Sequence, residues 1–347
     1  MINNGNKDNC HEVSLYVVRS PLQLLNCYEA SKRYADSSYK ILLLLYRQEF
    51  DRDLMVNLLE EPAWNEVIVT DFRSNINQLR LIVSLLKKID SIDLCVIGDY
   101  THTINMLINR RKPRKIVWVD DGVATLQTAK LIADGHFFSL DKHFQKKSRL
   151  TTLLEKISRS DRGYLKEAEF FTIYDSIRNY SSKFNVVAND YRHLRERIES
   201  LPVRDVIYFI GNDLRRYVLR DPDRFEDYIA SVSKHYHGRD WRYILHRKED
   251  VGYMQKLADK YGFRLEKFDR ILEQQFAHQA WYPAEISTIC SSALDTLSII
   301  YRPHLTAFRL NTEDVRSDRE IGVEELYKHY DRMKVKILPC ANVSMTP

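Results

Sequence analysis

Short runs of β-branched and aromatic residues alternate with amphipathic segments, and this alternation limits the fold more than any other feature of the sequence. The first half predicts strands at 13–18, 40–46, 66–70, 94–98 and 115–119. It predicts helices at 24–34, 51–60 and 76–89, a further helix that ends at 109, and one that begins at 124. Strands that alternate with helices of about 10–15 residues are typical of a parallel, doubly wound sheet. The predicted fold class is therefore α/β.

A second series of the same kind follows a looser stretch, which carries strand-like runs at 169–174 and 185–188. It predicts strands at 205–210, 241–245, 264–268 and 284–290, and helices at 225–236, 251–261 and 294–300. A length of 347 residues also suggests two domains, at about 150 residues each. We expect Rossmann-like domains at 1–200 and 201–347, with a C-terminal helix packing back on the first domain.

The strand expected at 115–119 ends abruptly in Asp120, Asp121 and Gly122. In open α/β sheets, ligands bind beyond the carboxyl ends of the strands, so this end is a candidate catalytic position. Adjacent strand residues point to opposite faces, and only one of the two aspartates should face the crevice. Asp and Gly are also common turn residues, which is the structural alternative. The sequence does not choose between the aspartates.

Composition excludes several classes of protein. Hydrophobic residues make up 44% and charged residues 29%, as in an ordinary globular protein. The net charge of +5 comes from 53 basic and 48 acidic residues mixed through the chain, so no nucleic-acid partner is expected. One dense basic cluster, residues 110–115, could meet anionic lipid, although a solvated loop is the alternative.

Cysteine usage and hydropathy suggest a compartment. The five cysteines are odd in number and form no CxxC pair, which favours a reducing compartment and argues against zinc. The polar start of the chain lacks the apolar core of a signal peptide, and no apolar run approaches the roughly 20 residues of a membrane span. We expect a cytoplasmic protein, in contact with the cytoplasmic face of the inner membrane.

Four short motifs lie at predicted strand ends: Ser20-Pro21-Leu22-Gln23, Asp120-Asp121-Gly122, His246 and Ser291-Ser292. In their order they resemble the motifs of bacterial GT-B sialyltransferases. The similarity is to the lipooligosaccharide sialyltransferase and polysialyltransferase families, and it spans most of the chain. Arg247 follows the histidine where those families have proline.

The resemblance implies a GT-B architecture, with two doubly wound domains facing across a cleft, and an inverting glycosyltransferase. In those families the acidic motif supplies the general base, here Asp120 or Asp121, while the histidine and the serine pair hold the donor phosphate. Imidazole, hydroxyls and helix N–H groups suit a phosphate, so no cofactor and no metal are expected. The catalytic candidates are Asp120, Asp121 and His246, and the donor-binding candidates are Ser20, Gln23, Gly122, Gly211, Asn212, His246, Glu273, Ser291 and Ser292.

Some of these assignments have competitors. Glu273 lies where related enzymes place an acid on the ribose, but Glu266 and Glu285 are alternatives. Gly211 and Asn212 could bring backbone close to the nucleotide, and a tight turn explains them equally well. Two other patterns are weak as metal sites: the DxD triplet at 51–53 opens a predicted helix, and the histidines at 235 and 237 lack a third ligand.

The expected reaction is transfer of sialic acid, or of a related nonulosonic or keto-acid sugar, from a CMP-sugar to a hydroxyl of a cell-surface glycan. The expected partners are a CMP-sugar donor, a glycan or lipid-linked saccharide acceptor, and anionic membrane. One alternative is a transferase of Kdo, legionaminic or pseudaminic acid in bacterial capsule or lipopolysaccharide synthesis. The other is a non-catalytic nucleotide-sugar binding or scaffold protein.

Overall fold

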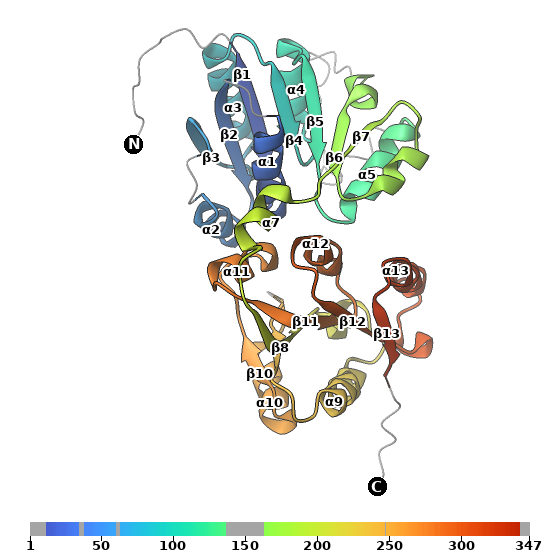
Figure 1. Ribbon diagram of the computed structural model, residues 1–347. Coiled ribbons are helices and arrows are strands. Elements are labelled where there is room, and N and C mark those ends of the chain that lie inside the picture. Colours follow the sequence, from blue (N-terminus) through green and yellow to red (C-terminus); the bar gives the residue numbers. More distant parts are fainter. Residues whose placement is uncertain (1–11, 35–37, 60–62, 137–162, 247, 341–347) are drawn as a thin grey trace. The chain divides into compact units, whose positions relative to one another are not determined.

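The computed structural model describes residues 12–34, 38–59, 63–136, 163–246 and 248–340 (Figure 1). They belong to two compact units, Met1–His193 and Leu194–Pro347, which we call the N-terminal and C-terminal units. The division falls seven residues before the expected boundary, close to the start of helix α7 (Arg192–Ile198). Each unit has its own sheet and its own core.

The N-terminal unit contains a seven-stranded sheet in which every pairing is parallel. Its first strand is central, with the second and third strands on one side and the later strands on the other, which is the strand order of a Rossmann fold. In spatial order the strands are β3 (Glu66–Asp71), β2 (Tyr39–Tyr46), β1 (Val13–Val18), β4 (Leu94–Ile97), β5 (Lys115–Val119), β6 (Glu169–Thr172) and β7 (Asn185–Ala188).

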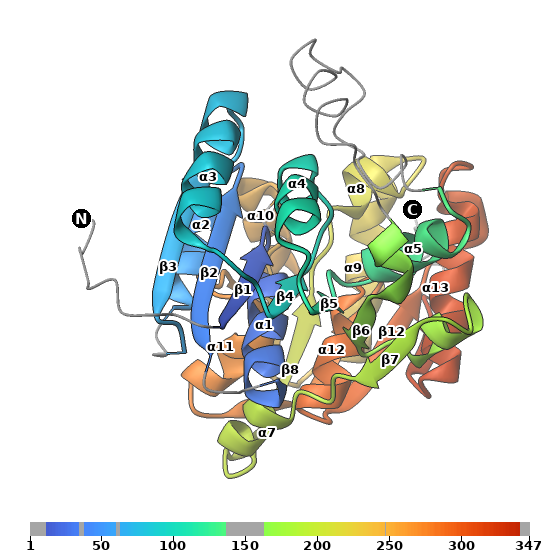
Figure 2. The same cartoon turned by 90° about the horizontal axis from the view of Figure 1, so that it is seen from above.

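Helices cover both faces of this sheet (Figure 2). Alternate residues of β1 explain why: Leu15 packs toward α3, α4 and α5, whereas the ring of Tyr16 contacts Trp64, which in turn contacts Tyr28 of α1. Strands buried on both faces become continuous apolar runs, as seen in β1 and β2. The helices are α1 (Pro21–Arg33), α2 (Glu49–Asn57), α3 (Asn75–Lys88), α4 (His102–Arg111) and α5 (Ala124–Ala133), with short 3-10 turns at Gly163–Glu167 and Asp175–Asn179.

The C-terminal unit repeats the same strand order in a six-stranded parallel sheet. Tyr208 stacks with Phe276 on one face, whereas Phe209 packs into the core formed with α9 and α10 on the other. The strands in spatial order are β10 (Arg264–Glu266), β9 (Trp241–Ile244), β8 (Val203–Ile210), β11 (Tyr282–Thr288), β12 (His304–Arg309) and β13 (Lys336–Pro339). The helices are α8 (Leu214–Tyr217), α9 (Phe225–His235), α10 (Val251–Tyr261), α11 (Leu272–His278), α12 (Ala293–Ile300) and α13 (Glu320–Arg332).

The predicted class, α/β with two doubly wound Rossmann-like domains, is confirmed by the two sheets. The face-to-face arrangement across a cleft stays a prediction, as does the packing of a C-terminal helix on the first domain. Six helices and strands were not predicted by residue range: α7, α8, α11, β12, α13 and β13. Among the described residues, no helix combines the length and the apolar character needed to cross a bilayer.

Candidate functional site

The strand order fixes where each sheet can hold a ligand. In the N-terminal unit, the chain adds β2 and β3 on one side of β1 and then returns to place β4 on the other. The crevice beyond the carboxyl ends of β1 and β4 is therefore the switch point of the sheet, where ligands of open α/β sheets bind. Ser20 follows β1, Asp99 follows β4, and Asp121 follows the neighbouring strand β5.

Asp121 is half-buried at this edge and is held from two sides. The Ser20 hydroxyl donates to its Oδ1 (2.8 Å), and its own backbone N–H donates to Thr125 Oγ1 (2.8 Å). Gly122 follows with a φ of +63°, the left-handed region that glycine adopts without strain. The sharp turn after β5 therefore leaves the Asp121 carboxylate at the end of the strand, in contact with a hydroxyl.

Asp120 has a different environment, because only 1% of it is exposed. Its Oδ1 accepts the Thr172 hydroxyl (2.6 Å), and its Oδ2 accepts the backbone N–H of Ile173 (2.8 Å). Burial raises the pKa of Asp120 to about 7, against the opposing effect of these hydrogen bonds. The side chain joins the end of β5 to the end of β6, so Asp121 is the more exposed of the two candidate bases.

Ser20 also begins helix α1. Its side chain accepts the backbone N–H of Gln23 (3.3 Å), and Pro21 occupies the first turn, where a missing N–H is tolerated. Gln23 is buried, and its Oε1 accepts the backbone N–H of Arg19 (2.8 Å). A Cβ on Gly98 would lie 2.4 Å from Gln23 Cγ, so glycine is required where Gln23 crosses β4. The structure thus gives Gln23 a supporting position under the turn.

Arg19 and Asp99 form an ion pair at the switch point that the sequence did not single out as functional. Burial and the charge of Asp121 raise the pKa of Asp99, while the Arg19 guanidinium opposes that shift. The only sequence signal was the position of Asp99 at the end of a strand. The pair places a cation and a second carboxylate next to Asp121.

In the C-terminal unit, the switch point lies between β8 and β11. Asn212, after β8, donates its side-chain amide to the carbonyl of Cys290, after β11, and so ties the two strand ends together. A Cβ on Gly211 would lie 2.5 Å from Tyr243 Cε1 and 2.6 Å from Glu249 Oε2. Gly211 is therefore required by packing between strand ends, and its role toward a nucleotide stays a prediction.

His246 follows β9 and is fixed through its backbone. Glu249 Oε2 accepts the N–H of His246 (2.7 Å), and the N–H of Glu249 donates to the carbonyl of His246 (3.0 Å). The other oxygen, Oε1, accepts the Tyr243 hydroxyl (2.6 Å). Burial raises the pKa of Glu249 to about 7, with a further increase from the charge of Asp213. Sequence reasoning missed Glu249, and Arg247 lies outside the described residues.

A cavity of about 250 Å³ borders this turn. Apolar side chains from α8, α9 and α10 form part of its wall, and Asp213 and Glu249 contribute carboxyl groups. The Arg215 guanidinium lies 3.8 Å from the ring centre of Tyr253, another wall residue. The lining also includes Arg216, Lys248 and Asp250, so three basic and three acidic residues border the cavity next to the His246 turn, and neither sign of charge is in excess.

Ser291 and Ser292 lie at the start of α12. The Ser291 hydroxyl accepts the N–H of Ala293 (3.3 Å), while its backbone exchanges two hydrogen bonds with the Tyr330 hydroxyl (2.8 and 2.7 Å). Ser292 is the N-terminal cap, but its side chain makes no capping hydrogen bond. Hydroxyls and helix N–H groups thus meet at this end, an arrangement suited to phosphate oxygens.

Glu273 is buried on α11, where its Oε1 accepts the Thr296 hydroxyl (2.6 Å) of α12. Burial raises its pKa. Its two competitors are both engaged elsewhere in the unit: Glu266 pairs with Arg242 (2.8 Å) and Glu285 with Arg239 (2.9 Å). The structure therefore brings Glu273 next to the helix that the serine pair begins, and leaves the other two in ion pairs.

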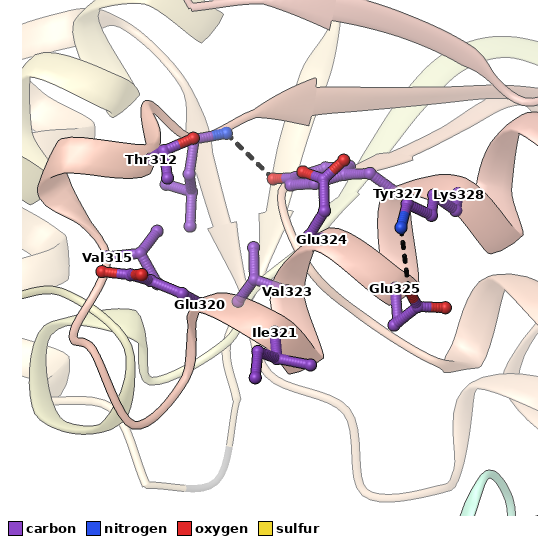
Figure 3. A pocket seen from close by; sticks show the side chains of 10 residues that line it. Thr312, Val315, Glu320, Ile321, Val323, Glu324, Glu325, Tyr327 and Lys328 are labelled. Atoms are coloured by element: carbon purple, nitrogen blue, oxygen red, sulfur yellow. Dashed lines mark hydrogen bonds and ion pairs between the residues drawn. The ribbon is translucent and has the colours of Figure 1, made fainter.

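A second cavity, of about 400 Å³, lies between the end of β12 and α13 (Figure 3). Its floor is apolar, and the acidic side chains around it pair with cations, for example Glu325 with Lys328 (2.9 Å). None of the predicted site residues lines it. The cavity therefore lies apart from the motifs described above.

The two weak metal-like patterns of the sequence make other contacts in the structure. Within the described ranges, no group of three or more His, Cys, Asp or Glu side chains is placed to hold a metal ion. Asp53 of the DxD triplet lies on α2 and pairs with Arg52 (2.7 Å), and His235 packs edge-on against Phe308. Metal independence stays a prediction.

Comparison with known proteins finds structural similarity at low sequence identity. No protein-family model matches the chain, and no curated protein sequence does. UDP-GlcNAc 2-epimerase from Neisseria meningitidis, bound to UDP-GlcNAc, shares 11% identity at a TM-score of 0.49, over 93% of this chain and 91% of that one. MurG from Acinetobacter baumannii shares 9% identity at a TM-score of 0.43, over 96% of this chain and 87% of that one. UGT89C1 from Arabidopsis thaliana, complexed with UDP-L-rhamnose, shares 10% identity at a TM-score of 0.49, over 94% of this chain and 84% of that one. At these values the likenesses assign no activity to this chain.

Proposed function

We propose that the chain is an inverting, metal-independent glycosyltransferase that moves sialic acid, or a related nonulosonic or keto-acid sugar, from a CMP-sugar to a glycan hydroxyl. One observation carries the proposal. At the carboxyl edge of the N-terminal sheet, the acidic motif resolves into a buried structural Asp120 and an accessible Asp121 that contacts Ser20 of the first motif. Two motifs separated by about a hundred residues of sequence thus meet at the position where chemistry is expected.

Asp121 has the role of general base in this proposal. Its carboxylate takes the proton of the acceptor hydroxyl while that oxygen forms a bond to the anomeric carbon of the donor sugar. The bond from that carbon to the phosphate oxygen breaks, and CMP leaves with the electron pair. Attack opposite the leaving group inverts the anomeric centre. Positioned general bases of this kind contribute about 10²–10⁴-fold to rate.

The C-terminal unit has the role of donor binding. His246, the two serines and the N–H groups at the start of α12 are the partners proposed for the phosphate, whose charge develops as CMP leaves. Glu273, next to α12, is the residue proposed for the ribose hydroxyls.

The deciding experiment measures CMP release by the purified full chain. The donor panel contains CMP-sialic acid, CMP-Kdo and CMP-pseudaminic acid, with UDP-GlcNAc as the competing nucleotide class, all in EDTA. Turnover of one CMP-sugar supports the proposal, and the donor that reacts names the sugar. Turnover of UDP-GlcNAc alone, or a requirement for added magnesium, contradicts it.

A binding measurement separates the enzyme from a non-catalytic nucleotide-sugar binding protein. Calorimetry with CMP should show binding by the wild type and by Asp121→Asn, and much weaker binding by the Ser291→Ala/Ser292→Ala variant. An exposed serine of the N-terminal unit gives a matched control, for which Ser182→Ala should keep wild-type affinity. Tight CMP binding without turnover of any CMP-sugar would favour the scaffold alternative.

The proposed location is the cytoplasmic face of the inner membrane, with peripheral contact to anionic lipid. A net charge of +5 and the basic cluster at 110–115 support it. Such contact weakens as salt screens the charges, with a Debye length of about 8 Å at physiological ionic strength. Vesicle flotation at low and high salt tests this part of the proposal.

A further inference from the structure

Exposed large hydrophobic side chains are concentrated at one edge of the N-terminal unit. Of the thirteen such side chains in the described residues, seven lie on the consecutive elements α2, β3 and α3. Single exposed apolar residues are normal on a protein surface, whereas a cluster indicates an interaction site. The seven are Phe50, Val56, Val67, Val69, Ile76, Leu79 and Val83.

Helix α3 carries the most regular part of this cluster. Ile76 is 61% exposed, Leu79 40% and Val83 44%. Spacings of three and four residues put these side chains on one face of a helix. The opposite face is already used, since Leu81, Ile82 and Leu85 are buried in the core under the sheet. Helix α3 therefore has a second apolar stripe that no described element covers.

Unpaired cations lie along the same stripe. Arg80 and Lys87 are exposed, each four residues beyond an apolar member of the stripe, and neither has an ion-pair partner among the described residues. The other basic side chains of this helix and the turn before it are neutralised: Lys88 pairs with Glu66 and Arg73 with Asp71. The free charge beside the apolar stripe is therefore positive.

The basic cluster of the sequence joins this surface. Helix α3 packs beside α4, and the Arg111 guanidinium donates to the carbonyl of Leu86 near the end of α3. The neighbouring Arg110 and Lys112 are exposed and have no ion-pair partner in the parts of the chain that the structure describes. One exposed acid, Asp90, follows α3. Four free cations thus border the stripe against one free carboxylate.

We propose that the N-terminal unit docks on an anionic lipid surface through this α3 face, defined as Ile76, Leu79, Arg80, Val83 and Lys87, with Arg110 and Lys112 at its end. The inference rests on the proposed peripheral location and is independent of the transfer reaction. Aliphatic side chains enter the boundary between headgroups and acyl chains, and cations beside them pair with lipid phosphates. A second copy of the chain fits less well, because a self-complementary contact would bring the same free cations together.

The test uses the full chain and vesicles of phosphatidylcholine with or without phosphatidylglycerol. Arg80→Gln/Lys87→Gln removes charge, and Leu79→Ser/Val83→Ser removes apolar area. Lys234→Gln/Lys256→Gln and Ile321→Ser are matched controls, since these side chains are exposed on the C-terminal unit and Ile321 is 80% exposed. Circular dichroism checks that each variant is folded.

Each cation near an anionic surface strengthens binding about fivefold, so the charge variant should bind about 25-fold more weakly and with reduced salt dependence. The apolar variant should lose about tenfold or more at every salt concentration. Both controls should bind as the wild type does. Wild-type binding that is absent, or equal for neutral and anionic vesicles, would contradict the peripheral location itself. If the wild type binds in a salt-dependent way and the α3 variants bind equally well, the α3 face is not the docking surface. The same conclusion follows if the wild type forms a dimer without lipid and the α3 substitutions dissociate it.

Discussion

Replacing each aspartate of the acidic motif by asparagine should give two variants with opposite defects. Asp121→Asn removes the proposed base, so turnover should fall by about 10²–10⁴-fold while CMP affinity and stability are kept. Asp120→Asn removes a buried carboxyl group that touches no substrate in the proposal. Its effect should appear in the pH dependence of stability, with turnover altered far less.

The size of that effect follows from the raised pKa. Asp120 has a pKa of about 7 in the folded protein, against the ordinary value of 3.8. Because the pKa is higher in the folded than in the unfolded protein, folding favours the protonated form of Asp120. The stability that this carboxyl contributes is therefore complete below pH 3.8 and is lost as the pH rises through 7. With about 1.4 kcal/mol per pKa unit, the loss is about 2 kcal/mol at pH 5 and about 4 kcal/mol at pH 8.

Asparagine suits the site because both existing contacts can be kept. Its oxygen can accept the N–H of Ile173, and its amide can donate to Thr172 Oγ1, since a hydroxyl also accepts. Urea unfolding of the wild type and Asp120→Asn at pH 5 and pH 8 measures the difference directly. The free energy of unfolding of the wild type should fall by about 2–3 kcal/mol relative to the variant between these pH values.

Two results would refute this reasoning. Parallel pH profiles for the wild type and Asp120→Asn would mean that the buried carboxyl does not titrate as burial requires. Near-normal CMP release by Asp121→Asn, or a larger loss in a stably folded Asp120→Asn, would remove Asp121 as the base. Asp93→Asn is a useful control, because Arg114 lowers the pKa of that carboxyl and its substitution should shift the pH profile in the opposite sense.

Three further outcomes are expected. Gly98→Ala should destabilise the N-terminal unit by about 1–3 kcal/mol in thermal unfolding, because the new Cβ displaces the buried Gln23 side chain; an unchanged Tm would contradict the packing. Glu249→Ala should weaken CMP binding about tenfold in calorimetry by releasing the backbone of His246, whereas Glu249→Gln should keep most of the affinity; equal losses would point to a direct role of the charge. His246→Ala should weaken CMP binding with unchanged circular dichroism, and wild-type affinity would exclude the histidine from the phosphate site.

The sequence predicted the fold well because core strands such as β1 and β2 are nearly continuous apolar runs. In the N-terminal unit the predicted strands at 13–18, 40–46 and 66–70 match β1, β2 and β3 to within a residue at either end. The last third of the sequence was predicted less well. Strand β13 has only four residues, all at least partly exposed, and α13 has a mixed polar surface with Tyr327 and Tyr330 as its buried residues.

The candidate site was predicted in part, for a physical reason. Alternation along β5 correctly indicated that Asp120 and Asp121 would have different surroundings, but the choice between them depends on Thr172 and Ile173, about fifty residues away. Likewise, the role of Glu249 depends on a turn back to His246, and the pairing of Arg19 with Asp99 on the order of strands. Contacts made across a sheet are fixed by topology, which no local pattern of residues reports.

The position of the first strand in each sheet has a consequence for synthesis. Strand β1 gains its second neighbour only when residues 94–97 have been made, and β8, at residues 203–210, must wait for β11 at 282–288. Parallel pairings between segments so far apart form slowly, because a long loop must close before the contacts can stabilise it. The N-terminal unit can complete its sheet while the ribosome is still translating the C-terminal unit, whereas the C-terminal unit stays without its central pair until residue 288 has been made. Chaperone demand should therefore be greatest before β11 is made, when the apolar strands β8 and β9 are exposed without it.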